Sequence, residues 1–213
     1  MNKPVKAVIL DWNGTVLDDV ALCVDLLNEL LTECNHPAVD RSRYLEIFDF
    51  PIKEYYKRAG FDFSKESYEE LADRYMPRYL SRYEAESVVY PDVQSFLTRC
   101  REEGIITAVL SVTRHDYLVD QVARLGLRDS FDYVVGQGDH YGGGKEVLAD
   151  ELIMRMGVSV DEVLFVGDTT HDHEVASSVG AGCILISHGH QSRRRLQEIT
   201  AQVVDSFDEI ELD

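Results

Sequence analysis

The chain has 213 residues, of which 45% are hydrophobic and 28% charged, as expected of a globular protein with one ordinary domain and an insertion. Its 39 acidic and 21 basic side chains give a formal net charge of −18, which argues against nucleic acid and anionic membranes as partners. The cysteines form no close-spaced pair, no apolar run approaches the roughly 20 residues of a membrane span, and no signal peptide precedes the first apolar segment. These features predict a cytoplasmic protein with reduced thiols.

The first third of the chain reads as one strand followed by helices. Residues 5–10 end in Val-Ile-Leu and predict a buried parallel strand. Residues 19–34 carry apolar side chains at helical spacing, and Asp18 or Asp19 can cap the start of this helix. The polar, aromatic-rich region that follows contains no clear strand, so a helical insertion is expected. Its helices are predicted near 41–48, 51–59 and 64–83.

From about residue 88, strands and helices alternate to the end of the chain. The helices end at glycine, the residue that a left-handed C-cap favours. This alternation predicts an α/β fold with a Rossmann-like, doubly wound parallel sheet. Strands are expected at 105–110, 133–135, 163–166, 183–186 and 202–204, with helices at 92–103, 115–125, 145–156, 171–179 and near 190–199.

Polar side chains follow the predicted strands in a fixed order. Asp11 comes directly after the first strand, and Ser111 after the second. Lys145 begins a helix after a glycine-rich loop, and Asp168 and Asp172 follow the strand Val-Leu-Phe-Val. In open α/β sheets, ligands bind at the carboxyl ends of the strands. The aspartates are therefore candidates for a site that binds a hard cation such as Mg²⁺.

This ordered set resembles the haloacid dehalogenase (HAD) superfamily, whose first motif is Asp-x-Asp-Gly-Thr. Here the motif reads Asp11-Trp12-Asn13-Gly14-Thr15, so an asparagine replaces the second aspartate. The resemblance covers the whole chain and is closest to phosphoglycolate phosphatase-like members with a helical cap. It implies a core domain formed by residues 1–17 and 88–213 and a helical cap domain formed by residues 18–87.

The resemblance also implies a role for each candidate residue. Asp11 would be the nucleophile that forms an aspartyl-phosphate, and Lys145 would neutralise the phosphate and orient Asp11. Mg²⁺ would be held by a carboxylate oxygen of Asp11, the backbone carbonyl of Asn13 and Asp168, while Asp172 would hold a metal-bound water. The phosphate-binding candidates are Trp12, Ser111, Val112 and Lys145, with Thr113 as the competitor of Ser111.

Asn13 departs from the family motif in a way that affects the chemistry, because an amide can donate a hydrogen bond but cannot shuttle a proton. In phosphatases of the family the aspartate at this position protonates the leaving group, so a slow enzyme is expected here, and a large gain in rate in Asn13→Asp would show that the missing acid limits it. Three alternatives remain open. A different acid, such as His115, His171 or a residue of the cap, can take over; the substrate bond can be one that needs no acid; or the protein can bind phosphate with little turnover.

The second alternative has a concrete form, which involves a lysine of the cap. Phosphonoacetaldehyde hydrolases of the same superfamily also have a tryptophan after the nucleophile, and they use a cap lysine that forms a Schiff base. Lys53 is the best-placed candidate here, ahead of Lys57 and Lys65, although a surface lysine is the more common explanation of such a residue. The main prediction is thus a Mg²⁺-dependent phosphatase of a small phosphorylated metabolite, as a monomer or homodimer.

Overall fold

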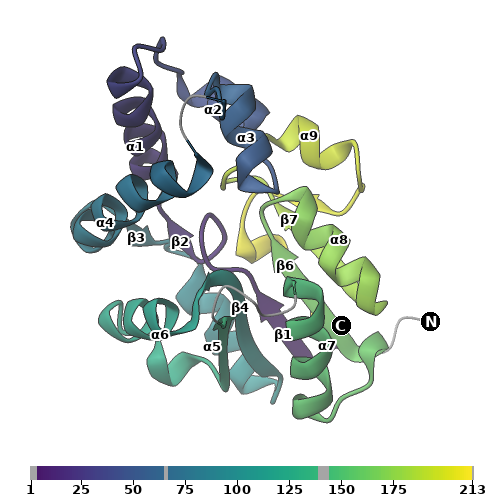
Figure 1. Ribbon diagram of the computed structural model, residues 1–213. Helices are drawn as coiled ribbons and strands as arrows, with labels where there is room; N and C mark the ends of the chain where they lie inside the picture. Colours follow the sequence, from purple (N-terminus) through teal and green to yellow (C-terminus); the bar gives the residue numbers. More distant parts are fainter. Residues whose placement is uncertain (1–3, 65–66, 139–143, 213) are drawn as a thin grey trace.

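The computed structural model describes residues 4–64, 67–138 and 144–212. A parallel sheet with helices on both faces forms one part of the molecule, and the helices α1–α4 form a second part above it (Figure 1). The predicted fold class, an α/β Rossmann-like core with an added helical segment, is confirmed.

The sheet has six strands in the order β5-β4-β1-β6-β7-β8, and every neighbouring pair is parallel. Strand β1 lies between β4 and β6, so the chain leaves β1 where the strand order changes direction. This is the position at which doubly wound sheets form their ligand crevice. The strands are β1 (Ala7–Leu10), β4 (Ile106–Arg114), β5 (Tyr133–Gln137), β6 (Val163–Gly167), β7 (Gly182–Ile186) and β8 (Val203–Val204).

Both faces of the sheet are buried, because successive side chains of a strand point to opposite sides. In β1, Val8 and Leu10 pack on the face covered by α5 and α6, whereas Ala7 and Ile9 pack on the face covered by α7 and α8. The helices of this part are α5 (Val93–Glu102), α6 (His115–Arg124), α7 (Lys145–Met156), α8 (Thr170–Val179) and α9 (Arg193–Gln197), with short 3₁₀ turns at Arg128–Ser130, Val160–Glu162 and Phe207–Glu209.

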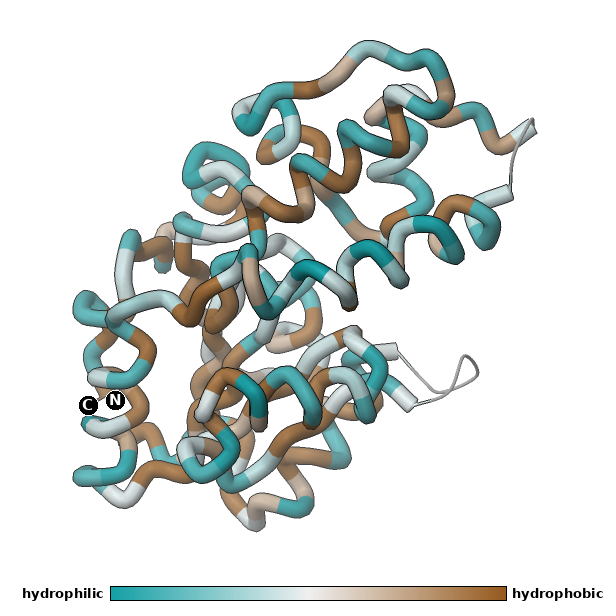
Figure 2. Tube along the Cα trace, turned by 90° about the vertical axis from the view of Figure 1, so that its left-hand side faces the viewer, coloured by the Kyte–Doolittle hydropathy of each residue, from teal (hydrophilic) through white to brown (hydrophobic). Residues whose placement is uncertain are grey.

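The cap helices have a hydrophobic core of their own, which holds them together independently of the sheet. In Figure 2 separate brown, hydrophobic stretches run through the upper and the lower part of the molecule. The tyrosines of α4 stack at helical spacing, with ring centroids 6.1 Å apart both from Tyr75 to Tyr79 and from Tyr79 to Tyr83. The cap helices are α1 (Val20–Glu33), α2 (Arg41–Ile47), α3 (Ile52–Ala59) and α4 (Tyr68–Glu86).

A two-stranded antiparallel ribbon joins the two parts. Strand β2 (Leu17–Asp18) pairs with β3 (Val88–Val89), with Leu17 opposite Val89 and Asp18 opposite Val88. The chain thus enters and leaves the cap through adjacent strands. The boundaries predicted for the core (1–17 and 88–213) and for the cap (18–87) fall in this ribbon and stay a prediction.

Several predicted boundaries were wrong by a few residues. Strand β4 does not end at residue 110 but continues to Arg114, because Ser111 and Arg114 still pair with β5, with an irregularity between them. Helix α4 begins after Ser67 instead of at 64, since Ser67 and Glu70 form a capping box there. The last helix covers only Arg193–Gln197.

Other sequence predictions are confirmed. The glycines predicted to end helices at positions 104, 126, 157 and 180 all have positive φ, between 69° and 83°. The four cysteines are free thiols. Within the described ranges, no helix has both the length and the apolar character needed to cross a bilayer. The glycine-rich loop predicted at 137–144 lies largely outside the described residues.

Candidate active site

A buried lysine joins two aspartates at the carboxyl end of the sheet. Asp11 directly follows β1, Lys145 is the first residue of α7, and Asp172 lies in the first turn of α8. The Lys145 ammonium donates to Asp11 Oδ1 at 2.5 Å and to Asp172 Oδ1 at 2.7 Å. Lys145 is only 6% exposed, so this ion pair is shielded from solvent. The two hydrogen bonds of Lys145 therefore join three predicted site residues that come from distant segments of the chain.

The third aspartate, Asp168, follows β6 and is fully buried. Its Oδ1 accepts a hydrogen bond from Thr15 Oγ1 at 2.9 Å, and its Oδ2 accepts one from the backbone N–H of His190 at 2.6 Å. The backbone packs closely around this carboxylate: a Cβ added at Gly14, where φ is +77°, would lie 2.3 Å from Asp168 Oδ2, and one at Gly189 would lie 2.2 Å from it. Glycine is required at both positions because any side chain would displace the carboxylate.

One oxygen from each of Asp11, Asp168 and Asp172 lies within 4.8 Å of the others, and we call these three residues the carboxylate cluster. Burial raises the pKa of Asp11 to about 7, against the opposing charge of Lys145, and burial likewise raises the pKa of Asp168 to about 6. Burial also acts on Asp172, but Lys145 and the hydrogen bonds from Thr169 outweigh it and lower the pKa of Asp172.

The carboxylate cluster fits a divalent cation. Oxygen ligands are those that Mg²⁺ prefers, and a bound cation would remove the repulsion between the acidic groups. Asp172 is fixed for such a role, because its Oδ2 accepts hydrogen bonds from the backbone N–H of Thr169 at 3.0 Å and from the Thr169 hydroxyl at 2.7 Å. The ligands predicted from the sequence, apart from the carbonyl of Asn13, are thus brought together.

The predicted phosphate-binding residues are placed differently from one another. Ser111 is buried, and its Oγ accepts the backbone N–H of Thr113 at 3.1 Å, whereas Val112 is exposed. Trp12 points into the hydrophobic core, where its indole N–H donates to Gln121 Oε1 at 2.8 Å. Any contact of Trp12 with phosphate would therefore come from its backbone and not from its ring.

Asn13 is held by residues of both the core and the cap. Its amide nitrogen Nδ2 donates to Asp19 Oδ2 at 2.8 Å and to the hydroxyl of Tyr79 in α4 at 2.7 Å. Its Oδ1 accepts from Thr113 Oγ1 at 3.0 Å. Asp19 was expected to be a possible helix cap, but its side chain makes no cap hydrogen bond and points to Asn13 instead.

His190 connects Asp19 to the cap. Its Nε2 lies 3.2 Å from Asp19 Oδ1, and its Nδ1 lies 2.8 Å from the hydroxyl of Tyr44 in α2. Its ring also stacks on Phe48, with centroids 4.7 Å apart. The sequence did not identify four of these residues as part of the site, because their local spacing looks the same as that of helix-capping residues and of aromatic residues in a core. They are Asp19, Tyr44, Tyr79 and His190.

The remaining candidates from the sequence lie in other environments. Lys53 is exposed on α3, with its Nζ 5.4 Å from the centroid of the Phe63 ring. The ring of His171 packs at 4.8 Å from that of Phe50. His115 accepts the backbone N–H of Gly136 at its Nδ1.

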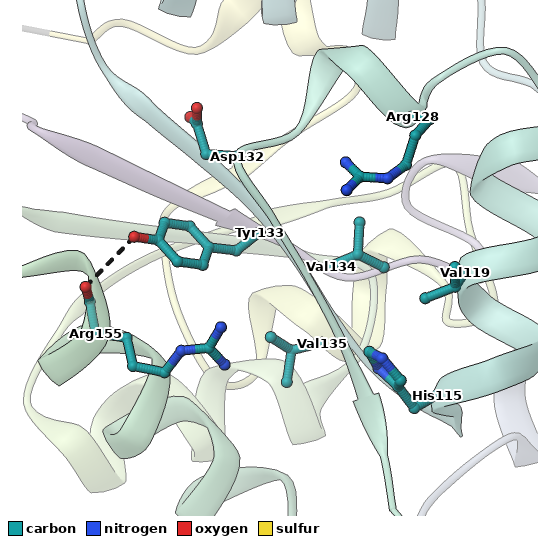
Figure 3. Close-up of a pocket in the computed structure, with 8 residues that line it drawn as sticks. All are labelled: His115, Val119, Arg128, Asp132, Tyr133, Val134, Val135 and Arg155. Atoms are coloured by element: carbon teal, nitrogen blue, oxygen red, sulfur yellow. Dashed lines mark hydrogen bonds between the residues drawn. The ribbon is translucent and has the colours of Figure 1, made fainter.

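His115 also lines a hollow of ≈ 430 Å³ along the edge strand β5, which Figure 3 shows. The carboxylate cluster does not line this hollow, so the hollow is separate from the candidate active site. The lining residues are His115, Val119, Arg128, Asp132, Tyr133, Val134, Val135 and Arg155.

A parallel α/β sheet with an aspartate directly after its first strand, a buried lysine and a further acidic pair is typical of a class of hydrolases. The model of the haloacid dehalogenase-like hydrolase family matches residues 8–186, which is most of the chain, and the protein belongs to this family. The resemblance seen in the motifs is thereby confirmed, and the match includes Asp11, Lys145, Asp168 and Asp172.

Similar proteins support this assignment along the whole chain. The phosphoglycolate phosphatase of Synechococcus elongatus is 26% identical over 192 residues, which cover 90% of this chain and 88% of the relative. A crystal structure from Lactobacillus delbrueckii subsp. bulgaricus has a TM-score of 0.82 at 19% identity and covers 97% of each chain. Protein Tyrosine Kinase A of Mycobacterium tuberculosis has a TM-score of 0.75 at 20% identity, covering 99% of this chain and 93% of that one. The shared fold alone therefore does not decide the activity.

Trp12→Phe tests whether the indole serves stability or substrate binding. The variant leaves the buried Gln121 side chain without its hydrogen-bond donor, which should lower the free energy of unfolding by about 1–3 kcal/mol. Because the ring points away from the carboxylate cluster, KM for a phosphate ester should stay unchanged. Chemical denaturation followed by circular dichroism and steady-state kinetics measure the two effects. A raised KM at unchanged stability would contradict the structural role.

The pH dependence of cation binding tests the carboxylate cluster. The folded-state pKa values of Asp11 and Asp168 lie above their usual 3.8, so their contribution to the stability of the metal-free protein is fully present below pH 3.8 and is lost as the pH rises from there through about 6 to 7. A cation binds the deprotonated groups. The increase in Tm caused by about 10 mM Mg²⁺ should therefore be at least about twofold larger at pH 8 than at pH 5.5.

Asp168→Asn is the matched variant for this experiment, because it removes one charge while keeping the size of the side chain. We expect it to abolish most of the Mg²⁺-dependent increase in Tm. An increase that is equal at both pH values, or that survives in Asp168→Asn, would show that Mg²⁺ binds elsewhere.

Proposed function

We propose that the protein is a Mg²⁺-dependent phosphatase that hydrolyses a small phosphorylated metabolite through an aspartyl-phosphate on Asp11. The observation that carries this proposal is the ion pair of Asp11 with the buried Lys145 beside Asp168 and Asp172. A carboxylate that attacks an anionic phosphate needs positive charge close by, and Lys145 supplies one such charge at 2.5 Å from Asp11 Oδ1.

The reaction consists of two displacements at phosphorus. In the first, a carboxylate oxygen of Asp11 forms a bond to phosphorus, and the bond between phosphorus and the ester oxygen breaks, so that the alcohol leaves with a proton from its surroundings. In the second, a water oxygen attacks the phosphorus of the aspartyl-phosphate. The Asp11–phosphorus bond breaks, the water loses a proton, and inorganic phosphate is released.

Mg²⁺, when bound, supplies additional positive charge for the phosphoryl group. The side chains of Asp11 and Asp168 would hold it, together with the backbone carbonyl of Asn13, and Asp172 would hold a water bound to it. Lys145 keeps Asp11 oriented in both displacements, because its second hydrogen bond to Asp172 at 2.7 Å fixes the ammonium. Ser111 is the residue we propose for hydrogen bonding to a phosphate oxygen, with the backbone N–H groups after it.

Asn13 limits which esters are hydrolysed well. An amide cannot transfer a proton to the leaving oxygen, and a positioned general acid contributes about 10²–10⁴ to the rate. We therefore propose a slow phosphatase that prefers esters of acidic alcohols, whose leaving oxygen needs the least protonation. In the limit of very slow hydrolysis, the same site would bind phosphate with little turnover.

The proposal also includes the substrate class, the absence of nucleic acid and membrane partners, the location and the assembly of the protein. The relatives named phosphoglycolate phosphatase support a small, acidic phosphate monoester as the substrate class. The net charge of −18 supports a protein that binds neither nucleic acid nor anionic membranes. A cytoplasmic protein, present as a monomer or homodimer, remains the prediction for location and assembly.

Asp11→Asn tests the nucleophile. The amide cannot form the aspartyl-phosphate, so kcat/KM for p-nitrophenyl phosphate with Mg²⁺ should fall by at least about 10³-fold. Asp25→Asn, a matched change on the exposed face of α1, should leave the rate unchanged. Turnover retained in Asp11→Asn would exclude Asp11 as the nucleophile, and binding of 2-phosphoglycolate without turnover by the unmodified protein would favour the phosphate-binding alternative.

The phosphonoacetaldehyde hydrolase-like alternative is tested at Lys53. Because Lys53 is exposed and faces Phe63, we expect borohydride reduction in the presence of phosphonoacetaldehyde to give no adduct at Lys53 above that at the exposed Lys57. Peptide mass mapping measures both sites. Selective, stoichiometric labelling of Lys53 would support the C–P cleavage reaction instead of ester hydrolysis.

A further inference from the structure

Asp19 is a buried carboxylate on which three parts of the molecule converge. It lies between β2 and α1 and is 1% exposed. Its Oδ2 accepts from Asn13 Nδ2 and from the Tyr79 hydroxyl, each at 2.8 Å, and its Oδ1 lies 3.2 Å from His190 Nε2. The first of these partners follows β1, the second belongs to the cap and the third follows β7. A buried carboxylate needs such donors, because an unpaired buried charge is very costly.

The side chain at position 13 must therefore be a hydrogen-bond donor. The Asn13 amide donates to both Asp19 and Tyr79, while its oxygen accepts from Thr113. The orientation of the amide is thus fixed by its partners. A carboxylate at position 13 would have no hydrogen to offer Asp19, and two anionic oxygens would face each other at about 2.8 Å in a buried site.

Asp19 is also linked to the carboxylate cluster through His190. The ring of His190 contacts Asp19, and the backbone N–H of the same residue donates to Asp168 Oδ2 at 2.6 Å. The Tyr44 hydroxyl lies 2.8 Å from the other ring nitrogen of His190. A displacement of Asp19 would consequently reach Asn13, the cap and Asp168 together.

We propose that Asp19 is a positioning residue of the active site, which acts with Asn13 as one matched polar pair. Asp19 sets the orientation of the Asn13 amide beside Asp11 and holds Tyr79 of the cap against the core. The kinetic part of this inference rests on the proposed phosphatase function, whereas the pairing itself does not. The pairing also opposes the gain in rate that Asn13→Asp would give if the missing acid alone limited the enzyme.

A double-mutant cycle tests the pair. The variants are Asn13→Asp, Asp19→Asn and the double variant that exchanges the two residue types, with Asp18→Asn as the matched control. Asp18 is the residue directly before Asp19, at the end of β2, and does not take part in the contact. In the exchanged pair the amide at position 19 can donate to the carboxylate at position 13, which also accepts from Tyr79 and Thr113, so the contact is restored with reversed polarity.

The first measurement is Tm, which needs no assumption about the reaction. Asn13→Asp should lower Tm by about 10 °C, and the exchanged double variant should recover more than about half of that loss. Asp18→Asn should change Tm by less than about 2 °C. An Asn13→Asp variant that is as stable as the unmodified protein, or losses that simply add in the double variant, would overturn the pairing. If Asn13→Asp does not fold at all, a double variant that also fails to fold overturns it.

The second measurement is the kinetics of p-nitrophenyl phosphate hydrolysis with Mg²⁺. Asp19→Ala should lower kcat by at least about 10-fold with KM changed less than about 3-fold. The variant loses the contacts that orient Asn13 and Tyr79, whereas the residues proposed to bind phosphate stay in place. Asp19→Asn, which keeps the size and the acceptor, should recover most of kcat. The exchanged double variant should be at least about 10-fold faster than Asn13→Asp alone.

The two measurements separate the two claims. If the unmodified protein has no turnover, the proposed phosphatase function fails, and the Tm cycle still decides the pairing. If turnover is present, a single Asn13→Asp variant that is faster than the unmodified protein and indifferent to the residue at 19 overturns the positioning role. A coupled Tm cycle with kcat unchanged in Asp19→Ala also overturns the positioning role.

Discussion

The repulsion between three closely spaced carboxylates, two of them buried, is the constraint on which this structure depends. Asp11, Asp168 and Asp172 approach one another closely enough to share an ion, and burial raises the pKa of the first two. Lys145 compensates part of this charge through contacts to Asp11 and Asp172. Such a cluster is unfavourable for folding unless the surrounding structure holds it in place, and strained or repulsive arrangements of this kind are typical of functional sites.

The parallel sheet provides the rigidity that the cluster needs. Asp11 and Asp168 extend the adjacent strands β1 and β6, whose residues are paired in register up to Leu10 and Val166. Both strands are buried on their two faces, so neither can move without loss of core packing. The backbone comes so close to Asp168 at Gly14 and Gly189 that even a methyl group would not fit. The positions of the carboxylates therefore follow from the packing of the core.

The cap is attached to this rigid site by polar contacts as well as by the chain itself. The ribbon of β2 and β3 connects the two parts, and Asp19 lies immediately after it. The hydroxyl group of Tyr79 reaches Asp19, which directly follows the ribbon, and that of Tyr44 reaches His190 of the core. The orientation of the cap helices and the orientation of Asn13 consequently depend on the same few hydrogen bonds.

The sequence predicts the fold and the carboxylate cluster well because both depend on local patterns. An aspartate directly after an apolar strand indicates a position at the edge of the sheet, and this holds for Asp11 and for Asp168. The side chain of Asp19 was misinterpreted because its partner His190 lies 171 residues away, and no local pattern reports such a contact. His190 itself was placed in a helix that begins later, at Arg193. Trp12 was assigned to the site by analogy, whereas its partner Gln121 is 109 residues away in the core.

In the proposed function, Asp11 and Asp168 bind one divalent cation beside Lys145, and Asp172 holds a water bound to that cation. Anomalous diffraction from crystals soaked in Mn²⁺, which shares the preference of Mg²⁺ for carboxylate oxygens, tests it most directly. We expect a single strong anomalous peak within about 2.5 Å of carboxylate oxygens of Asp11 and Asp168. A peak bound elsewhere, with the carboxylate cluster empty at saturating Mn²⁺, would contradict it.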